Sequence, residues 1–143
     1  MKTVALLFLF LLPIQWEPSF EHAKVLASEK KELILLNFSG SDWCVPCISL
    51  RKDFLESEAF AAFAAENLIL VNADFPRKKK SQGDPAQIKR NASLAEQYNP
   101  NGIFPRTLLL NAEGKVLKTW EGKPKGSVDE WIAELKVVCQ ATK

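Results

Sequence analysis

The chain has 143 residues, of which 47% are hydrophobic and 25% charged, and its formal net charge is +2. This length and composition are typical of one globular domain that can bury a core without disulfide staples, and they exclude a disordered chain. Because 19 basic residues nearly balance 17 acidic ones, no long-range positive field attracts nucleic acid, and we expect no nucleic-acid partner.

The chain begins with a basic residue and a short apolar run. Lys2 precedes nine apolar residues, 4–12, fewer than the roughly 20 that a membrane-spanning helix needs. A basic start and an apolar middle are typical of a secretory signal, although no small-x-small cleavage site follows between residues 13 and 20. We therefore expect 1–16 to be a signal peptide or apolar N-terminal segment, 17–143 to be the folded domain, and the protein to be periplasmic or otherwise exported. The alternatives are a cytoplasmic protein whose first residues pack on the domain, and an uncleaved segment that contacts a membrane.

Hydrophobic spacing predicts the elements of the first half of the domain. A helix is expected over 19–31, and the apolar run 33–38 is typical of a strand buried on both faces. A helix is expected after Cys47, and it should end near Ser57, where a short second helix begins. The run 68–71 predicts a second buried strand.

The second half begins with an irregular stretch. Residues 76–89 lack periodicity and are predicted to be an exposed excursion, followed by a helix over 92–98 and a turn at 99–102. Strands over 107–111 and 115–120 should form a hairpin, and Ser127 or Asp129 can cap a last helix. Since helices separate the first two strands, these should be parallel. The sequence thus predicts an α/β fold, with a mixed four-stranded sheet flanked by helices.

A basic run, Arg77 to Lys80, falls inside the irregular stretch. It could be a docking patch for an acidic partner. Because the run borders Ser81 and Gly83 and has no interleaved aromatic residue, we interpret it as a solvated loop.

Cys44 and Cys47 form a C-x-x-C between the first strand and the helix after it. A cysteine at a helix start faces unpaired N–H groups and the positive end of the macrodipole, which lower the pKa of its thiol and favour the thiolate. Cys47 lies one turn further on and can resolve a mixed disulfide formed at Cys44. Pro46 suits the first helical turn, and Trp43 gives the pair a rigid apolar flank.

Other uses of the cysteine pair fit the sequence less well. A closed metal site needs about four ligands, and the further candidates are only His22 and Cys139, so we expect neither a metal nor another cofactor. A disulfide that closes so short a loop restricts the unfolded chain little, which argues against a purely structural staple. The pattern therefore favours a redox-active dithiol.

Trp43-Cys44-Val45-Pro46-Cys47 resembles the W-C-x-P-C motif of the thioredoxin superfamily. The longer phrase from Phe38 to Cys44 is similar to exported bacterial thioredoxin-like proteins, including disulfide-reductase domains. The resemblance implies a thioredoxin-like fold and a cis peptide bond before Pro105. It also implies that the backbone of Phe104 pairs with a substrate segment, and that Trp43 lines the substrate surface.

Two positions depart from the thioredoxin pattern. Asn37 stands where thioredoxins carry a buried acid that helps to move the proton of the second cysteine, and an amide cannot accept a proton in that way. A lysine that accompanies the acid on the next strand is replaced by Leu70. These two changes leave open which group accepts the proton of Cys47. Cys139, the odd cysteine, is expected to be a buried free thiol.

We therefore expect a monomeric thiol–disulfide oxidoreductase, a reductase or isomerase, with catalytic Cys44 and Cys47 and support from Trp43, Pro46 and Pro105. Its partners would be protein thiols and disulfides and an upstream thiol electron donor. The alternative is a non-catalytic binding or chaperone module that binds unfolded chains at the surface around the cysteine pair. A further alternative is a peroxidase-like activity in which Cys44 reacts with peroxide.

Overall fold

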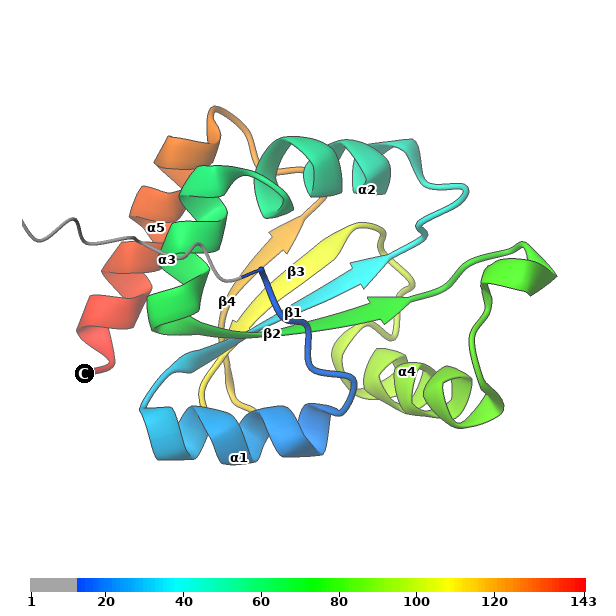
Figure 1. Ribbon diagram of the computed structural model, residues 1–143, viewed down its shortest axis with the longest axis horizontal. Helices are drawn as coiled ribbons and strands as arrows, with labels where there is room; N and C mark the ends of the chain where they lie inside the picture. Colours follow the sequence, from blue (N-terminus) through cyan, green and yellow to red (C-terminus); the bar gives the residue numbers. More distant parts are fainter. Residues whose placement is uncertain (1–12) are drawn as a thin grey trace, which may run out of the picture.

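Four strands and the helices that cover them make up the computed structural model, which describes residues 13–143 (Figure 1). The apolar run 4–12 lies outside the described residues. In chain order the elements are α1 (Phe20–Lys30), β1 (Leu33–Ser39), α2 (Val45–Leu50), a π-helical turn η1 (Arg51–Leu55), α3 (Glu58–Asn67), β2 (Leu68–Asp74), a 3₁₀ turn η2 (Lys79–Ser81), α4 (Pro85–Tyr98), β3 (Arg106–Leu110), β4 (Val116–Glu121) and α5 (Val128–Ala141).

The sheet has the strand order β2-β1-β3-β4. β1 pairs in parallel with β2, whereas β3 is antiparallel to both of its neighbours. β1 therefore lies inside the sheet with helices on both faces, and every one of its residues is buried. This burial explains its continuous apolar run, and the predicted mixed four-stranded sheet is confirmed.

Helices cover the two faces of the sheet, α1 and α4 on one and α2, α3 and α5 on the other (Figure 1). On the second face the fully buried Trp131 of α5 forms the centre of the core. Its ring centroid lies 5.4 Å from that of Phe60, 5.7 Å from that of Phe54 and 5.8 Å from that of Trp120. This aromatic cluster fixes α3 and α5 against the sheet.

Side-chain hydrogen bonds cap the N-termini of most of the helices. Ser19, Ser57 and Ser127 cap α1, α3 and α5, and Glu130 completes a capping box at Ser127. The prediction for α4 is wrong in its start, because the helix begins at Pro85 rather than at 92. Asp84 accepts a hydrogen bond from the backbone N–H of Gln87, and proline suits the first helical position, so the excursion is shorter than expected.

The described residues before α1 run along the edge of the sheet. Trp16 forms a parallel bridge with Leu70, and the backbone N–H of Glu17 donates to the carbonyl of Leu70 over 2.7 Å. Ile14 and Trp16 also pack on the core. The boundary at residue 16 stays a prediction. Within residues 13–143 no helix has the length and apolar character needed to cross a membrane.

Candidate active site

Cys44 and Cys47 are joined by a disulfide at the start of α2. Cys44 is the N-cap, and its Sγ accepts a hydrogen bond from the backbone N–H of Cys47 over 3.3 Å. Pro46 lies in the first turn, as predicted, and η1 continues the helix directly. A sulfur at this position faces the free N–H groups of the helix start, which stabilise a thiolate there once the disulfide is reduced.

The two sulfurs lie beneath an apolar rim. Cys44 is 5% and Cys47 4% exposed, whereas Val45 between them is 75% exposed. Ile48, one position beyond, is 46% exposed. Two exposed apolar side chains therefore adjoin the disulfide.

The loop that carries Cys44 is fixed by Asp74 at the end of β2. The Asp74 carboxylate accepts hydrogen bonds from the backbone N–H of Ser41 at 2.9 Å, from the Ser41 hydroxyl at 2.5 Å and from the Ser39 hydroxyl at 3.1 Å. The backbone N–H of Cys44 in turn donates to the carbonyl of Gly40 over 2.9 Å. These bonds fix the main chain before Cys44.

Trp43 is packed on several sides. Its Nε1 donates to the carbonyl of Phe75 over 2.8 Å, and its ring meets that of Phe104 edge-on with centroids 5.5 Å apart. The guanidinium of Arg77 lies 4.1 Å from its ring centroid, and a Cβ built on Gly40 would overlap its indole. The structure thus brings Trp43 and Phe104 together, and their role in binding substrate stays a prediction.

The Phe104–Pro105 peptide bond is cis, which confirms the expectation for Pro105. Phe104 contacts Trp43, so the turn before β3 lies beside the disulfide. The ring of Phe75 also meets Phe104, with centroids 5.6 Å apart. Three aromatic side chains from three separate segments therefore form one surface next to Cys44.

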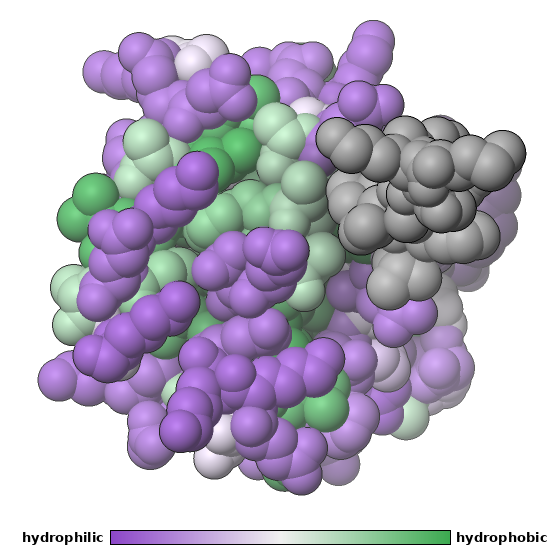
Figure 2. Space-filling model, turned by 60° about the vertical axis from the view of Figure 1, so that its left-hand side comes forward, coloured by the Kyte–Doolittle hydropathy of each residue, from purple (hydrophilic) through white to green (hydrophobic). Residues whose placement is uncertain are grey.

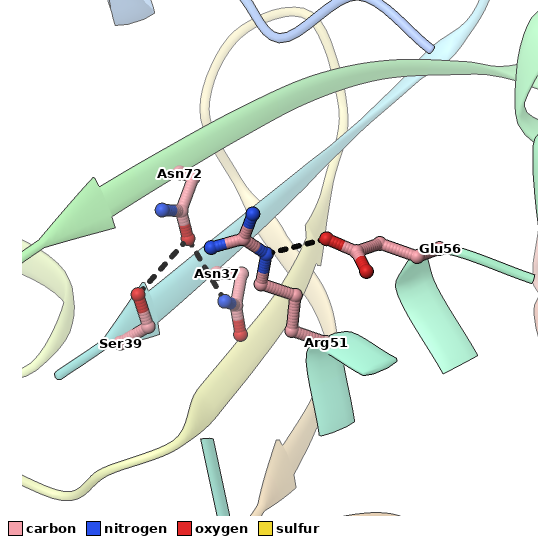
Figure 3. A network of polar contacts seen from close by, with 5 residues as sticks. All are labelled: Asn37, Ser39, Arg51, Glu56 and Asn72. Atoms are coloured by element: carbon pink, nitrogen blue, oxygen red, sulfur yellow. Dashed lines mark hydrogen bonds and ion pairs between the residues drawn. The ribbon is translucent and has the colours of Figure 1, made fainter. Parts of the chain in front are cut away.

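Polar side chains of β1 and β2 form a network that Arg51 approaches from η1 (Figure 3), and Asn37 and Asn72 of this network line the same pocket as Cys47. The amide Nδ2 of Asn37 donates to Oδ1 of Asn72 over 2.9 Å, and its Oδ1 accepts from the Thr107 hydroxyl over 3.0 Å. Asn37 is 3% exposed. Both ends of the amide are therefore bonded to protein, and this side chain joins β1, β2 and β3.

The residue opposite Asn37 is Asn72, so the expectation that Leu70 stands there is wrong. In the parallel register Leu70 pairs with Leu35, and Asn37 pairs with Asn72. The apolar run 68–71 marks only the first part of β2, which extends to Asp74 and carries Asn72 opposite Asn37.

A pocket of about 890 Å³ extends from this network along α2. Cys47, Asn37 and Asn72 line its floor, and Arg51 and Lys52 line its outer wall. The Arg51 side chain points towards Asn37 and Asn72 in Figure 3, and its Nε lies 2.6 Å from the carboxylate of Glu56. Since exposed side chains form this wall, the pocket opens to solvent.

The other metal-ligand candidates lie away from the cysteine pair. His22 is bonded to Glu17 on the surface at 2.9 Å, and Cys139 is a buried free cysteine in α5. Burial raises the pKa of the Cys139 thiol, with a smaller opposing effect of Lys143. Within residues 13–143 no three His, Cys, Asp or Glu side chains gather as a metal site would require.

Sequence reasoning missed four residues that shape the site: Gly40, Asn72, Asp74 and Phe75. None belongs to the C-x-x-C motif, and three of them lie on or just after β2, whose end was not predicted. Ser39-Gly40-Ser41 are residues typical of a turn, but the sequence gives no indication that Asp74 is their partner.

Comparisons with known proteins agree with this geometry. Residues 15–112 match the Thioredoxin-like family. The disulfide bond reductase DsbH of Chlamydia pneumoniae is 36% identical over 123 residues, which are 86% of this chain and 71% of that protein. The thioredoxin-related protein DsbJ of the same organism is 28% identical over 105 residues, but these are only 30% of its length.

A solved structure described as a DsbH oxidoreductase superposes with a TM-score of 0.80 at 33% identity, and the match covers 89% of this chain and 85% of the other. The family match spans more than half of the chain, and it includes the cysteine pair and the cis proline. The chain therefore belongs to the thioredoxin-like family.

Proposed function

We propose that Cys44 and Cys47 are the redox centre of this thiol–disulfide oxidoreductase, and that it reduces disulfide bonds in proteins. The observation that carries the proposal is the Cys44–Cys47 disulfide at the N-cap of α2. The name of a relative at 36% identity, a disulfide bond reductase, supports the reducing direction.

The reaction begins with the reduced pair. The Cys44 thiolate attacks one sulfur of a substrate disulfide, and the other substrate sulfur leaves as a thiolate that takes up a proton. Cys47 then loses its proton and attacks Sγ of Cys44, which releases the second substrate thiol. The substrate has gained two electrons and two protons, and the enzyme holds the Cys44–Cys47 disulfide. An upstream dithiol donor returns it to the reduced state.

The proton of Cys47 leaves without a buried carboxylate. Asn37 cannot take it, because an amide is not a base at neutral pH. Asp74 is already occupied by the hydroxyls of Ser39 and Ser41. The pocket beside Cys47 opens to solvent, so water in it is the acceptor that the geometry supports.

The substrate lies over the apolar rim. Val45 and Ile48 offer exposed apolar contact next to the disulfide, and the half-buried rings of Trp43 and Phe104 add a second apolar area beside Cys44. The backbone of Phe104 pairs with an extended substrate segment, and Pro46 and Pro105 shape the two loops that face it. A surface of this kind suits an extended chain better than a small molecule.

The proposal also includes the cellular location of the protein and its partners. Lys2 and the apolar run 4–12 support export, so the substrates are proteins outside the cytoplasm. The protein acts as a monomer that accepts electrons from a second thiol protein.

Trapping of the mixed disulfide tests the proposal. In Cys47→Ser the second step is absent, so disulfide-bonded substrate should stay attached to Cys44 and migrate as a covalent adduct on non-reducing gels. The matched control is Cys44→Ser, which keeps the buried Cys47 and should trap nothing. Both variants carry Cys139→Ser, so that no third thiol contributes.

A binding or chaperone module would give a different result. It would hold the same substrates without any covalent adduct in Cys47→Ser. Equal trapping by the Cys44→Ser control would also contradict the roles assigned to the two cysteines.

A further inference from the structure

The basic run 77–80, here called the basic loop, lies beside the cysteine pair. One carboxylate fixes it there: Oδ1 of Asp42 accepts the backbone N–H of Arg77 and Oδ2 that of Lys78, both over 2.9 Å. These two bonds lower the pKa of Asp42, with Lys78 adding to the effect. Since Asp42 is two residues before Cys44, the loop is attached to the active-site turn itself.

Arg77 makes the second attachment. Its guanidinium lies 4.1 Å from the ring centroid of Trp43, the residue directly before Cys44. The Trp43 indole is itself bonded to the carbonyl of Phe75, two residues before Arg77. The backbone anchor and the ring contact together fix a positive charge at the edge of the proposed substrate surface.

The charges of the basic loop are not neutralised by the protein. All four side chains are exposed, and within residues 13–143 none of them forms an ion pair with a carboxylate. The nearby Asp42 is bound to backbone N–H groups, and Asp84 caps α4. Four positive charges therefore stand together on a chain whose net charge is only +2.

Figure 1 shows where the backbone of the basic loop lies. β1 and β2 are parallel and end at the same edge of the sheet, and the connections to α2 and to η2 both leave from that edge. The loop with η2 reaches out beyond the sheet, next to the turn that leads to Cys44. A polypeptide that lies over the disulfide would pass within reach of Lys78, Lys79 and Lys80.

We propose that the basic loop is a docking site for acidic segments of protein substrates, close to the disulfide to be reduced. This inference rests on the proposed function, since it names the class of substrate for that same site. Clustered charges of one sign beside a reactive group raise the rate of encounter with oppositely charged partners by about tenfold or more at low salt. Salt at about 1 M shortens the screening length to roughly 3 Å and removes the effect.

Two synthetic peptides test the proposal. Both contain the same internal disulfide, one flanked by Asp and Glu and the other by Asn and Gln. The full chain, kept reduced by a dithiol, should have a kcat/KM about tenfold higher for the acidic peptide at low ionic strength. This ratio should fall to about one at high salt, and also in the variant K78Q/K79Q/K80Q.

Two control variants separate docking from other effects of the substitutions. K78R/K79R/K80R keeps the charges and should keep the ratio. K30Q/K115Q/K136Q removes three exposed lysines from the other end of the molecule, where hydrophilic side chains cover much of the surface (Figure 2). It should also keep the ratio, although it changes the net charge by the same amount.

The outcomes distinguish the two proposals. A ratio near one in the unmodified protein, or an unchanged ratio in K78Q/K79Q/K80Q, overturns the docking site. An equal loss in K30Q/K115Q/K136Q also overturns it, because net charge alone would then explain the preference. If neither peptide is reduced by the unmodified protein, the proposed function itself fails.

Discussion

Replacing Gly40 by alanine should move Trp43 away from the active site. A Cβ at position 40 would lie 2.5 Å from Cζ2 and 2.6 Å from Nε1 of the indole, whereas carbon atoms in contact are about 3.5–4 Å apart. Gly40 is not among the glycines with positive φ, so its backbone accepts alanine. The clash alone should force the indole to shift by about 1 Å.

The cost follows from what Trp43 would lose. Its hydrogen bond to the Phe75 carbonyl contributes about 1 kcal/mol. The contacts with the Phe104 ring and the Arg77 guanidinium contribute about 0.5–1.5 and 0.5–1 kcal/mol. We therefore expect Gly40→Ala to lower the free energy of unfolding by about 2–3.5 kcal/mol.

Urea unfolding of the oxidised protein measures this cost, and a double-mutant cycle tests its cause. In the background Trp43→Ala the indole is absent, so Gly40→Ala should then cost less than about 0.5 kcal/mol. If Gly40→Ala costs the same in both backgrounds, or costs nothing in the unmodified protein, the packing described for Trp43 is refuted.

Three further predictions concern titratable groups. Asn37→Asp places a carboxyl group behind Cys47, and burial raises the pKa of this carboxyl. The loss of stability should therefore grow as the pH rises through that pKa. Release of the mixed disulfide should become on the order of tenfold faster at neutral pH, because the carboxylate can accept the proton of Cys47. Cys139, whose pKa burial raises, should resist iodoacetamide at pH about 8 in the native oxidised protein and react fully in urea. The pKa of Asp53 is lowered by its bond to Lys123 and by Ser49, so this stabilisation is present above the unfolded-state pKa and lost as the pH falls through the folded-state pKa. Asp53→Asn should therefore shift the urea midpoint downward at neutral pH and leave it unchanged in strong acid.

Each of these has an outcome that contradicts it. A pH-independent cost for Asn37→Asp would mean that the new carboxyl is hydrated rather than buried. Alkylation of native Cys139 as fast as in urea would show that α5 does not cover it. An equal shift for Asp53→Asn in acid and at neutral pH would rule out the Lys123 contact as its cause.

The sequence predicted those parts of the fold in which the pattern is local. β1 was found because it is buried on both faces, and α5 because its apolar face and its Ser127 cap are both visible in the chain. The start of α4 was missed because Asp84 and Pro85 stand in a polar stretch where the helical period is weak.

Of the candidate site, the sequence predicted the C-x-x-C motif and the proline but not the residues that support them. Cys44 and Cys47 follow from a C-x-x-C between a strand and a helix, whereas the cis bond before Pro105 follows from the family resemblance. The supports of the site come from residues distant in the chain, since Asp74 and Asn72 meet the loop and β1 only through strand pairing. The basic loop, interpreted as solvated, gained its neighbours through Asp42, a contact that spans 35 residues.

The reduction potential of the Cys44–Cys47 pair, measured by equilibration of the full chain against glutathione buffers, tests the central claim most directly. A reductase supplied by an upstream dithiol predicts a value near that of thioredoxin, about −270 mV. A value near about −120 mV would make the protein an oxidant and reverse the proposed direction. If the two cysteines form no disulfide at any ratio of the buffer, the pair is not a redox centre and the account is wrong.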